Sequence, residues 1–138
     1  MQQAQTRFII NTHDKALYEF TDEVADWLAG TGIETGLLTL FCRHTSASLL
    51  INENAAPAVQ RDMLRWLDKV VPEGLHYEHD SEGPDDMPAH IRAMLTGTSL
   101  SVPVADGRMA LGTWQGLYLA EHRRMPHRRE VVAHLVGE

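Results

Sequence analysis

The fold class is decided by the stretch TSLSVPVADGRMALGTWQGLYLAEH, residues 98–122. Its Asp106-Gly107 pair is typical of a two-residue turn between antiparallel strands, because both turn positions need a positive φ that Gly, Asn and Asp tolerate best. Segments rich in strand-forming residues flank the pair on both sides. The stretch therefore predicts a hairpin with one strand before the turn and a second, longer strand after it.

Working outward from the hairpin, the rest of the chain alternates between strand and helix patterns without a linker or repeat. We expect further strands over 6–12, twice within 36–54 and over 129–136. The two runs within 36–54 are separated by His44-Thr45-Ser46, and they are apolar enough to predict burial on both faces.

Three helices are expected between these strands. The first follows a Thr21 cap and ends at Gly30 or Gly32. The second begins near Pro57, a residue tolerated in a first turn, with Asn54 as its cap. Its apolar stripe, which we interpret as core, consists of Val59, Met63, Trp66, Leu67 and Val70. A short third helix spans about 88–95 and is capped by Asp85 or Asp86.

The hairpins dominate this order of elements, so the sequence predicts an α+β fold with largely antiparallel sheets, two main helices and one short helix. We expect a single domain over residues 1–138, which is long enough to bury a core. No glycine-rich phosphate loop of the Walker or Rossmann type occurs.

Composition narrows the function classes. The formal net charge of -7 gives no global support for binding a nucleic-acid backbone. The single Cys42 excludes an intrachain disulfide. Neither a run long enough to span a membrane nor a secretion signal is visible, so we expect a cytoplasmic protein without membrane contact.

A cluster of histidines and carboxylates lies in HYEHDSEGPDDMPAHIRAML, residues 76–95. The Gly83-Pro84 turn folds the chain back, so His79 and His90 are able to meet at one point as metal ligands. Asp85 and Asp86 are interpreted mainly as helix caps. His76 is expected to be exposed and without a role.

Two other clusters have both a functional and a plain interpretation. Strand parity places Cys42 and His44 on one face, which suits a nucleophile pair but equally an ordinary core histidine. A group of arginines suits capture of phosphate or carboxylate, or is simply a solvated loop tip; it consists of Arg123, Arg124, Arg128 and Arg129.

Gly112 and Gly116 flank Thr113-Trp114-Gln115 in the expected second strand of the hairpin. Glycines weaken a strand interior unless the strand bulges or something approaches the backbone closely. If no bulge intervenes, Glu121 and His122 point to opposite faces and do not meet in one site.

Several long blocks of the sequence resemble the signature blocks of the YjbQ-like family of small bacterial and archaeal proteins. The blocks are HTSASLLINENAAP, YEHDSEGPDDMPAHI, LGTWQGLYLAEHR and RREVVAHLVGE. The resemblance implies a sandwich-like YjbQ fold, assembly as a homotrimer, a metal ion at clustered histidines and a secondary thiamine-phosphate synthase activity.

The family pattern singles out positions that this sequence matches residue by residue: His44, Thr45, Ser46, Asn52, Glu53, Asn54, His79, His90, the block 112–116 and Glu121. Some relatives carry a further histidine where Pro88 stands here, so a third ligand must come from elsewhere. We hypothesise that His44 joins His79 and His90 around a divalent ion, zinc by ligand type, with His122 in reserve. Mg²⁺ is the alternative if the reaction releases pyrophosphate.

Roles for the other residues follow from this hypothesis. Glu121 would act as general base or acid, and the remaining catalytic candidates are Gln115, Thr45 and Glu53. The substrate-binding candidates are Thr113, Ser46, Asn52, Arg123 and Arg129, the two arginines neutralising a phosphate.

Histidine ligands suit metal-assisted hydrolysis of a small phosphorylated molecule better than synthase chemistry, in which a leaving pyrophosphate needs Mg²⁺ and cations. The enzyme would then be a metal-dependent hydrolase or a transferase of the thiamine-phosphate synthase type. A non-catalytic trimer that binds a small anion is the other class.

Overall fold

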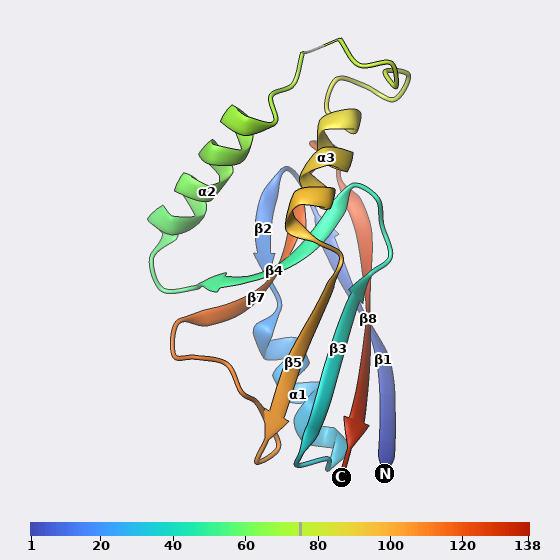
Figure 1. Cartoon of the computed structure of the whole chain (residues 1–138), viewed down its shortest axis with the longest axis vertical. Coiled ribbons are helices and arrows are strands. Elements are labelled where there is room, and N and C mark those ends of the chain that lie inside the picture. The colour runs from blue at the N-terminus through green and yellow to red at the C-terminus, as the bar shows by residue number, and fades with distance from the viewer. Residues whose placement is uncertain (75) are drawn as a thin grey trace.

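The computed structural model describes residues 1–74 and 76–138, and it contains two antiparallel sheets with three helices (Figure 1). The larger sheet has the strand order β1-β8-β3-β5-β6. Its strands are β1 (Gln2–Thr12), β8 (His127–Gly137), β3 (Gly36–Cys42), β5 (Ser99–Ala105) and β6 (Arg108–Met109). The predicted α+β class with antiparallel sheets is confirmed.

The smaller sheet has the order β2-β7-β4, from strands β2 (Ala16–Glu19), β7 (Gln115–Glu121) and β4 (Ala47–Glu53). β2 is absent from the sequence-based expectations. Apolar side chains of both sheets and of helix α1 (Thr21–Thr31) form the core, among them Leu38, Leu49 and Leu117, none of which is exposed to solvent.

The hairpin prediction is correct at the turn and wrong beyond it. Asp106 and Gly107 both adopt positive φ, 53° and 72°, and join β5 to β6. The second strand is only two residues long, however, because the chain then crosses to the smaller sheet. Residues 112–114 precede β7 rather than forming a strand interior.

Burial of β3 also differs from expectation. Leu38 and Leu40 are buried, while Leu37 and Phe41 are about half exposed at 49% and 48%. One face of β3 therefore remains open to solvent, so the alternating pattern of a half-covered sheet replaces the two-sided burial that was predicted.

Helix α2 (Pro57–Val70) begins at Pro57 as predicted, but it stands away from the sheets (Figure 1). Of its apolar stripe only Leu67 is buried, while Trp66 is 57% exposed. The interpretation of the whole stripe as core is wrong. Polar contacts near both helix ends join α2 to the rest of the fold: Gln60 Nε2 donates to the Tyr118 hydroxyl at 2.7 Å, and Arg92 Nη2 donates to Asp68 at 3.0 Å.

The expected helix caps are not formed by side chains. α1 starts at Thr21, whose hydroxyl donates to Glu19 instead of capping the helix. At α2 the cap position is Ala56, and the amide of Asn54 donates to Glu19. Only the C-terminal end of α1 is as expected, with Gly32 in the left-handed conformation that favours glycine.

Candidate metal centre

One oxygen of Asp86 faces two histidines at the start of α3 (Asp86–Thr96). His79 Nε2 lies 2.8 Å from Asp86 Oδ2, and His90 Nε2 lies 3.3 Å from the same oxygen. The three ligand atoms are all within 4.8 Å of one another. We call His79, Asp86 and His90 the histidine–aspartate cluster; in the described part of the chain it is the one group found with ligand atoms this close.

Local structure explains why these residues meet. His79 stands before the turn at Gly83, whose φ of 100° suits glycine, and the turn returns the chain to α3. Asp86 and His90 are four residues apart on the helix and so lie on one face. The two imidazole rings end with their centroids 5.6 Å apart.

The other ring nitrogen of His90 has a fixed partner. His90 Nδ1 lies 2.8 Å from the backbone carbonyl oxygen of Thr45, and a carbonyl only accepts, so Nδ1 carries the hydrogen. A neutral His90 then presents an unprotonated Nε2 toward Asp86. Metal-binding histidines have this second hydrogen bond as a rule, because it sets the tautomer and the ring orientation.

Asp86 is buried, with 2% of its residue surface exposed. Burial alone would raise the pKa of its carboxyl group. The hydrogen bond between His79 and Asp86 and the charge of Arg123 act against that effect, and the pKa is lowered below its ordinary value. A carboxylate is thus kept ionised in a buried position, where a cation is favoured.

The interpretation of Asp85 and Asp86 as helix caps needs correction. Neither makes a capping hydrogen bond to the helix backbone. Asp85 Oδ2 accepts from Arg123 Nε at 3.1 Å and from the backbone N–H of Arg124 at 3.0 Å. Both carboxylates therefore accept hydrogen bonds from residues outside the helix. The sequence signal that would have revealed Asp86 is its four-residue spacing from His90.

His44 is not brought into the cluster. Its Nε2 accepts a hydrogen bond from the backbone N–H of Glu130 at 2.8 Å, so the lone pair needed for a metal is already used. Burial and then the charge of Arg129 lower the pKa of His44, which keeps it neutral as an acceptor. The structure brings Asp86, and not His44, close to His79 and His90.

Glu121, the expected general base, lies in a buried ion pair. Arg129 Nε donates to its Oε1 at 2.7 Å, and the Thr12 hydroxyl donates to the same oxygen at 2.6 Å. Oε2 accepts the backbone N–H of Arg123 at 3.0 Å. Burial alone would raise the pKa of Glu121, but these donors lower it. A carboxylate so fully paired and without exposed surface has no access to a substrate.

The two arginines expected to bind phosphate are already paired with carboxylates. Arg129 is 4% exposed and also donates to the side chain and backbone oxygen of Ser46. Arg123 donates to Asp85, Asp86 and the carbonyl oxygen of Glu82. Ser46 is thereby occupied as well, and neither arginine is presented to an incoming anion.

His122, the reserve ligand, is buried directly after the end of β7. Its Nε2 lies 2.8 Å from the Ser48 hydroxyl, away from the cluster. Burial, followed by the charge of Arg92, lowers the pKa of His122 to about 4. It is therefore a neutral core histidine at pH 7. The separation of Glu121 from His122 agrees with strand parity.

The remaining predicted site residues lie at the opposite end of the smaller sheet. Glu53 at the end of β4 is paired with Gln115, whereas Ala47, six residues earlier at the start of β4, is paired with Glu121. At 3.3 Å per residue this separates the two ends by roughly 20 Å. Thr113 and Gln115 are exposed there, and Gln115 Oε1 accepts the backbone N–H of Gly112.

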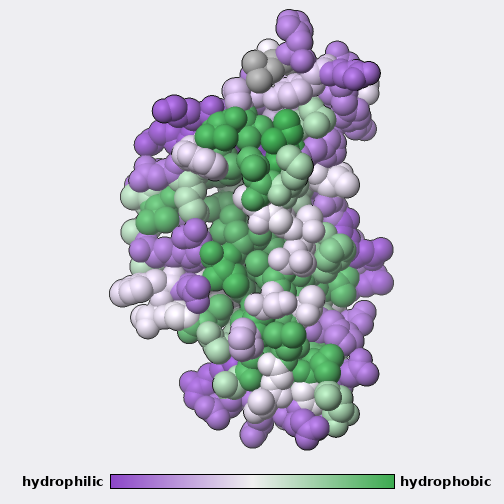
Figure 2. All heavy atoms as spheres, viewed as in Figure 1, coloured by the Kyte–Doolittle hydropathy of each residue, from purple (hydrophilic) through white to green (hydrophobic). Residues whose placement is uncertain are grey.

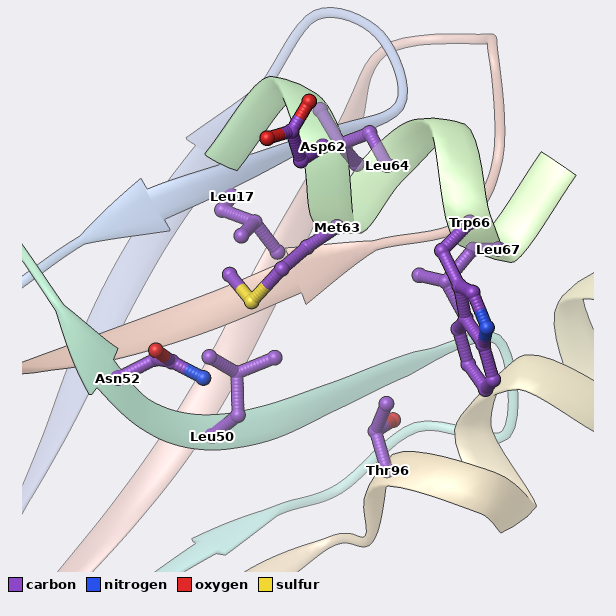
Figure 3. A pocket seen from close by; sticks show the side chains of 9 residues that line it. All are labelled: Leu17, Leu50, Asn52, Asp62, Met63, Leu64, Trp66, Leu67 and Thr96. Atoms are coloured by element: carbon purple, nitrogen blue, oxygen red, sulfur yellow. The ribbon is translucent and has the colours of Figure 1, made fainter. Parts of the chain in front are cut away.

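Thr45 is exposed and contributes to the cluster only through its carbonyl group. Asn52 lines a hollow of about 420 Å³ between α2 and the smaller sheet (Figure 3). Met63 points from α2 toward Leu50 and Asn52 across this hollow (Figure 3). Its other walls are mainly apolar, so it lacks the convergent ligands and charges of the cluster.

Comparison with known proteins identifies the family of this chain. The family model described as "UPF0047 protein YjbQ-like" matches residues 6–138. A UPF0047 protein of Synechocystis is 49% identical over 138 residues, covering 99% of this chain and 94% of the relative. The UPF0047 protein YjbQ of Salmonella typhimurium is 47% identical, covering 97% and 98%.

Solved structures agree. An uncharacterised protein of the YjbQ/UPF0047 family from Clostridium acetobutylicum is 37% identical with a TM-score of 0.88, covering 95% of this chain and 99% of that one. A hypothetical protein of Aeropyrum pernix is 29% identical with a TM-score of 0.90, covering 98% and 99%. This chain, with its antiparallel α+β fold, belongs to the YjbQ-like UPF0047 family.

Proposed function

We propose that this protein binds a divalent metal ion at the histidine–aspartate cluster and uses it to hydrolyse a small phosphorylated molecule. The observation that carries the proposal is one oxygen of a buried carboxylate facing two imidazole nitrogens, with all three ligand atoms within 4.8 Å of one another. Two imidazoles and one carboxylate are a frequent zinc donor set, so zinc is the proposed ion.

The chain's own residues fit such an ion. His90 carries its hydrogen on Nδ1, which leaves the lone pair of Nε2 available to bind the metal ion. The side chains of His79 and His90 are 49% and 30% exposed, so a substrate has access from solvent. When bound, zinc would supply a Lewis acid and lower the pKa of water at the site toward neutrality.

Glu82 is proposed as the general base in place of Glu121. Its Oε2 lies 3.7 Å from His79 Nε2, and its side chain is 65% exposed. Its carboxylate is therefore close to the cluster and open to a water molecule or substrate. Proton acceptance by a positioned carboxylate contributes on the order of 100-fold or more to such reactions.

The distribution of cations supports hydrolysis over synthesis as the main reaction. A thiamine-phosphate synthase must stabilise a departing pyrophosphate with Mg²⁺ and cationic side chains. Arg123 and Arg129 already hold carboxylates. We therefore keep the synthase activity implied by the family resemblance as a secondary one.

We also propose that the protein assembles as a homotrimer. Large apolar side chains are exposed on α2 and α3, in a region where Figure 2 shows hydrophobic surface; they are Trp66, Val70, Met94 and Leu95. Exposed apolar groups of this kind are typical of surfaces that become covered in an assembly. Light scattering coupled to size-exclusion chromatography gives the mass, which should be three times 15.5 kDa.

The test of function begins with chelator-treated protein to which Zn²⁺ is returned. Metal content is measured by mass spectrometry, and turnover is measured on a panel of phosphorylated small molecules. We expect stoichiometric zinc, turnover that depends on it, and loss of both in His79→Ala. His76→Ala is the matched control, because His76 lies in the same loop and is exposed.

Three outcomes contradict the proposal. Zinc-free wild-type protein after incubation with excess Zn²⁺ would exclude the metal site. Tight binding of a panel member without turnover would indicate the non-catalytic binding class. Full turnover by Glu82→Gln would remove Glu82 from its proposed role.

A further inference from the structure

The guanidinium group of Arg123 contacts three different acceptors beside the histidine–aspartate cluster. Nε donates to Asp85 Oδ2 at 3.1 Å, Nη1 donates to Asp86 Oδ1 at 2.8 Å, and Nη2 donates to the carbonyl oxygen of Glu82 at 2.8 Å. Its side chain is 16% exposed. The arginine thus joins the end of β7 to the loop and helix that carry the cluster.

These contacts divide the two oxygens of Asp86 between different partners. Oδ1 accepts from Arg123, while Oδ2 faces His79 and His90. The other two contacts, to Asp85 and Glu82, hold the planar guanidinium group so that Nη1 stays against Oδ1 of Asp86, which a single-point cation such as lysine does less well. Only one oxygen of Asp86 therefore remains directed toward the two imidazoles.

Backbone hydrogen bonds also fix the position of Arg123. Its backbone N–H donates to Glu121 Oε2 at 3.0 Å, and Glu121 is bound by Arg129 and Thr12. The next residue, Arg124, donates its backbone N–H to Asp85 at 3.0 Å. The buried Glu121–Arg129 pair thereby fixes the point from which Arg123 reaches the cluster.

We propose that Arg123 is a positioning residue of the metal centre, which restricts Asp86 to ligation through Oδ2 alone. The inference rests on the proposed function, since it requires a metal ion at the cluster. Single-oxygen ligation leaves more of the coordination shell for water and substrate than a chelating carboxylate does. Arg123 also balances one of the two adjacent charges of Asp85 and Asp86, which lessens their mutual repulsion.

The test compares Arg123→Ala with Arg123→Lys and with Arg124→Ala. Arg124 is the matched control, because it is the adjacent arginine and its side chain pairs with Glu73 instead of the cluster. Zn²⁺ affinity is measured by competition with a chelating dye, and Co²⁺ is added as a spectroscopic probe. Partners that orient metal ligands usually change affinity by about 10- to 100-fold when removed.

We expect Arg123→Ala to bind Zn²⁺ about 10- to 100-fold more weakly. Its Co²⁺ spectrum should shift toward a weaker, higher-coordinate form, because Asp86 becomes free to chelate with both oxygens. Arg123→Lys should recover part of the affinity, and Arg124→Ala should match the wild type in both measurements.

The outcomes separate this inference from the proposed function. Wild-type protein that binds neither Zn²⁺ nor Co²⁺ overturns both. Wild-type binding together with an Arg123→Ala variant that equals Arg124→Ala in affinity and spectrum overturns the inference alone. If Arg123→Ala does not fold, as judged by circular dichroism, Arg123→Lys decides: affinity and spectrum identical to wild type overturn the role of the guanidinium fork.

Discussion

The carboxylate of Asp86 faces the imidazole of His90 one helical turn further along α3, with 3.3 Å between Oδ2 and Nε2. Asp86→Asn keeps the shape of this side chain and removes its charge. We expect zinc affinity to fall at least about 10-fold, because the ion loses an anionic ligand. Calorimetric titration with Zn²⁺ measures the change.

Asp80→Asn is the control for this variant, since Asp80 is an exposed acid in the same loop. It changes the net charge by the same amount without touching the cluster. Equal losses of affinity in the two variants would show that general charge, and not ligation by Asp86, determines binding.

Buried His122 should make the folded state sensitive to acid. Its pKa is near 6.5 in the unfolded chain and about 4 in the folded protein. Between those values the unfolded chain binds more protons, so stability is complete above pH 6.5 and is lost as the pH falls toward 4. The shift corresponds to roughly 3 kcal/mol.

Urea unfolding of metal-free protein at pH 7 and pH 4.5 measures this dependence. His122→Gln should be less stable at pH 7 and should lose less stability on acidification than the wild type. His76→Gln replaces an exposed histidine and should leave the acid sensitivity unchanged. An unchanged pH slope in His122→Gln would refute the assignment to His122.

The Glu121–Arg129 ion pair should be costly to break from one side. Arg129→Met leaves a buried carboxylate without its cation, which typically costs about 3–5 kcal/mol of unfolding free energy. Adding Glu121→Gln should recover part of this loss, because it removes the unpaired buried charge. The single oxygen of the amide can still accept the backbone N–H of Arg123, and its NH2 group can donate to the hydroxyl oxygen of Thr12. Urea denaturation of both variants at pH 7 gives the comparison, and a double variant no more stable than the single one would contradict it.

Gly36 is required by the close approach of β3 and β8. A Cβ atom at this position would lie 2.3 Å from the backbone oxygen of Val136, which has no room to move within the sheet. We expect Gly36→Ala to lower the free energy of unfolding by about 3 kcal/mol or more.

Gly30→Ala provides the contrast. Gly30 lies in α1 with nothing within 4 Å of an added Cβ, so alanine should raise stability by about 0.5–1 kcal/mol through its better helix propensity. Thermal denaturation of the two variants should therefore move in opposite directions, and a loss of stability in Gly30→Ala would count against this account of α1.

The sequence predicted features that depend on local chemistry and failed where long-range packing decided. The Asp106-Gly107 turn needs positive φ, which residue type reveals directly. The start of α2 at Pro57 is likewise local. By contrast, the residues after the turn do not show how long the second strand is, because its length depends on which sheet the chain joins next. The end of β6 at Met109 was therefore not predictable from the sequence.

The same distinction applies to the candidate site. The turn at Gly83 indicated that His79 and His90 meet, and they do. Asp86 was missed because an acid at a helix start suits a cap as well as a ligand. His44 was misplaced because strand parity gives the direction of a side chain, whereas its partner is the backbone of Glu130, 86 positions away.

The central position of β8 has a consequence for synthesis. β8 is the last strand in sequence, yet it pairs with both β1 and β3 in the larger sheet. While the chain emerges from the ribosome, β1 and β3 therefore lack their common partner until residues 127–137 leave the exit tunnel. Their exposed edges are open to pairing with other chains during that interval. Dependence on protective chaperones should accordingly be greatest for nascent chains that have not yet reached residue 127.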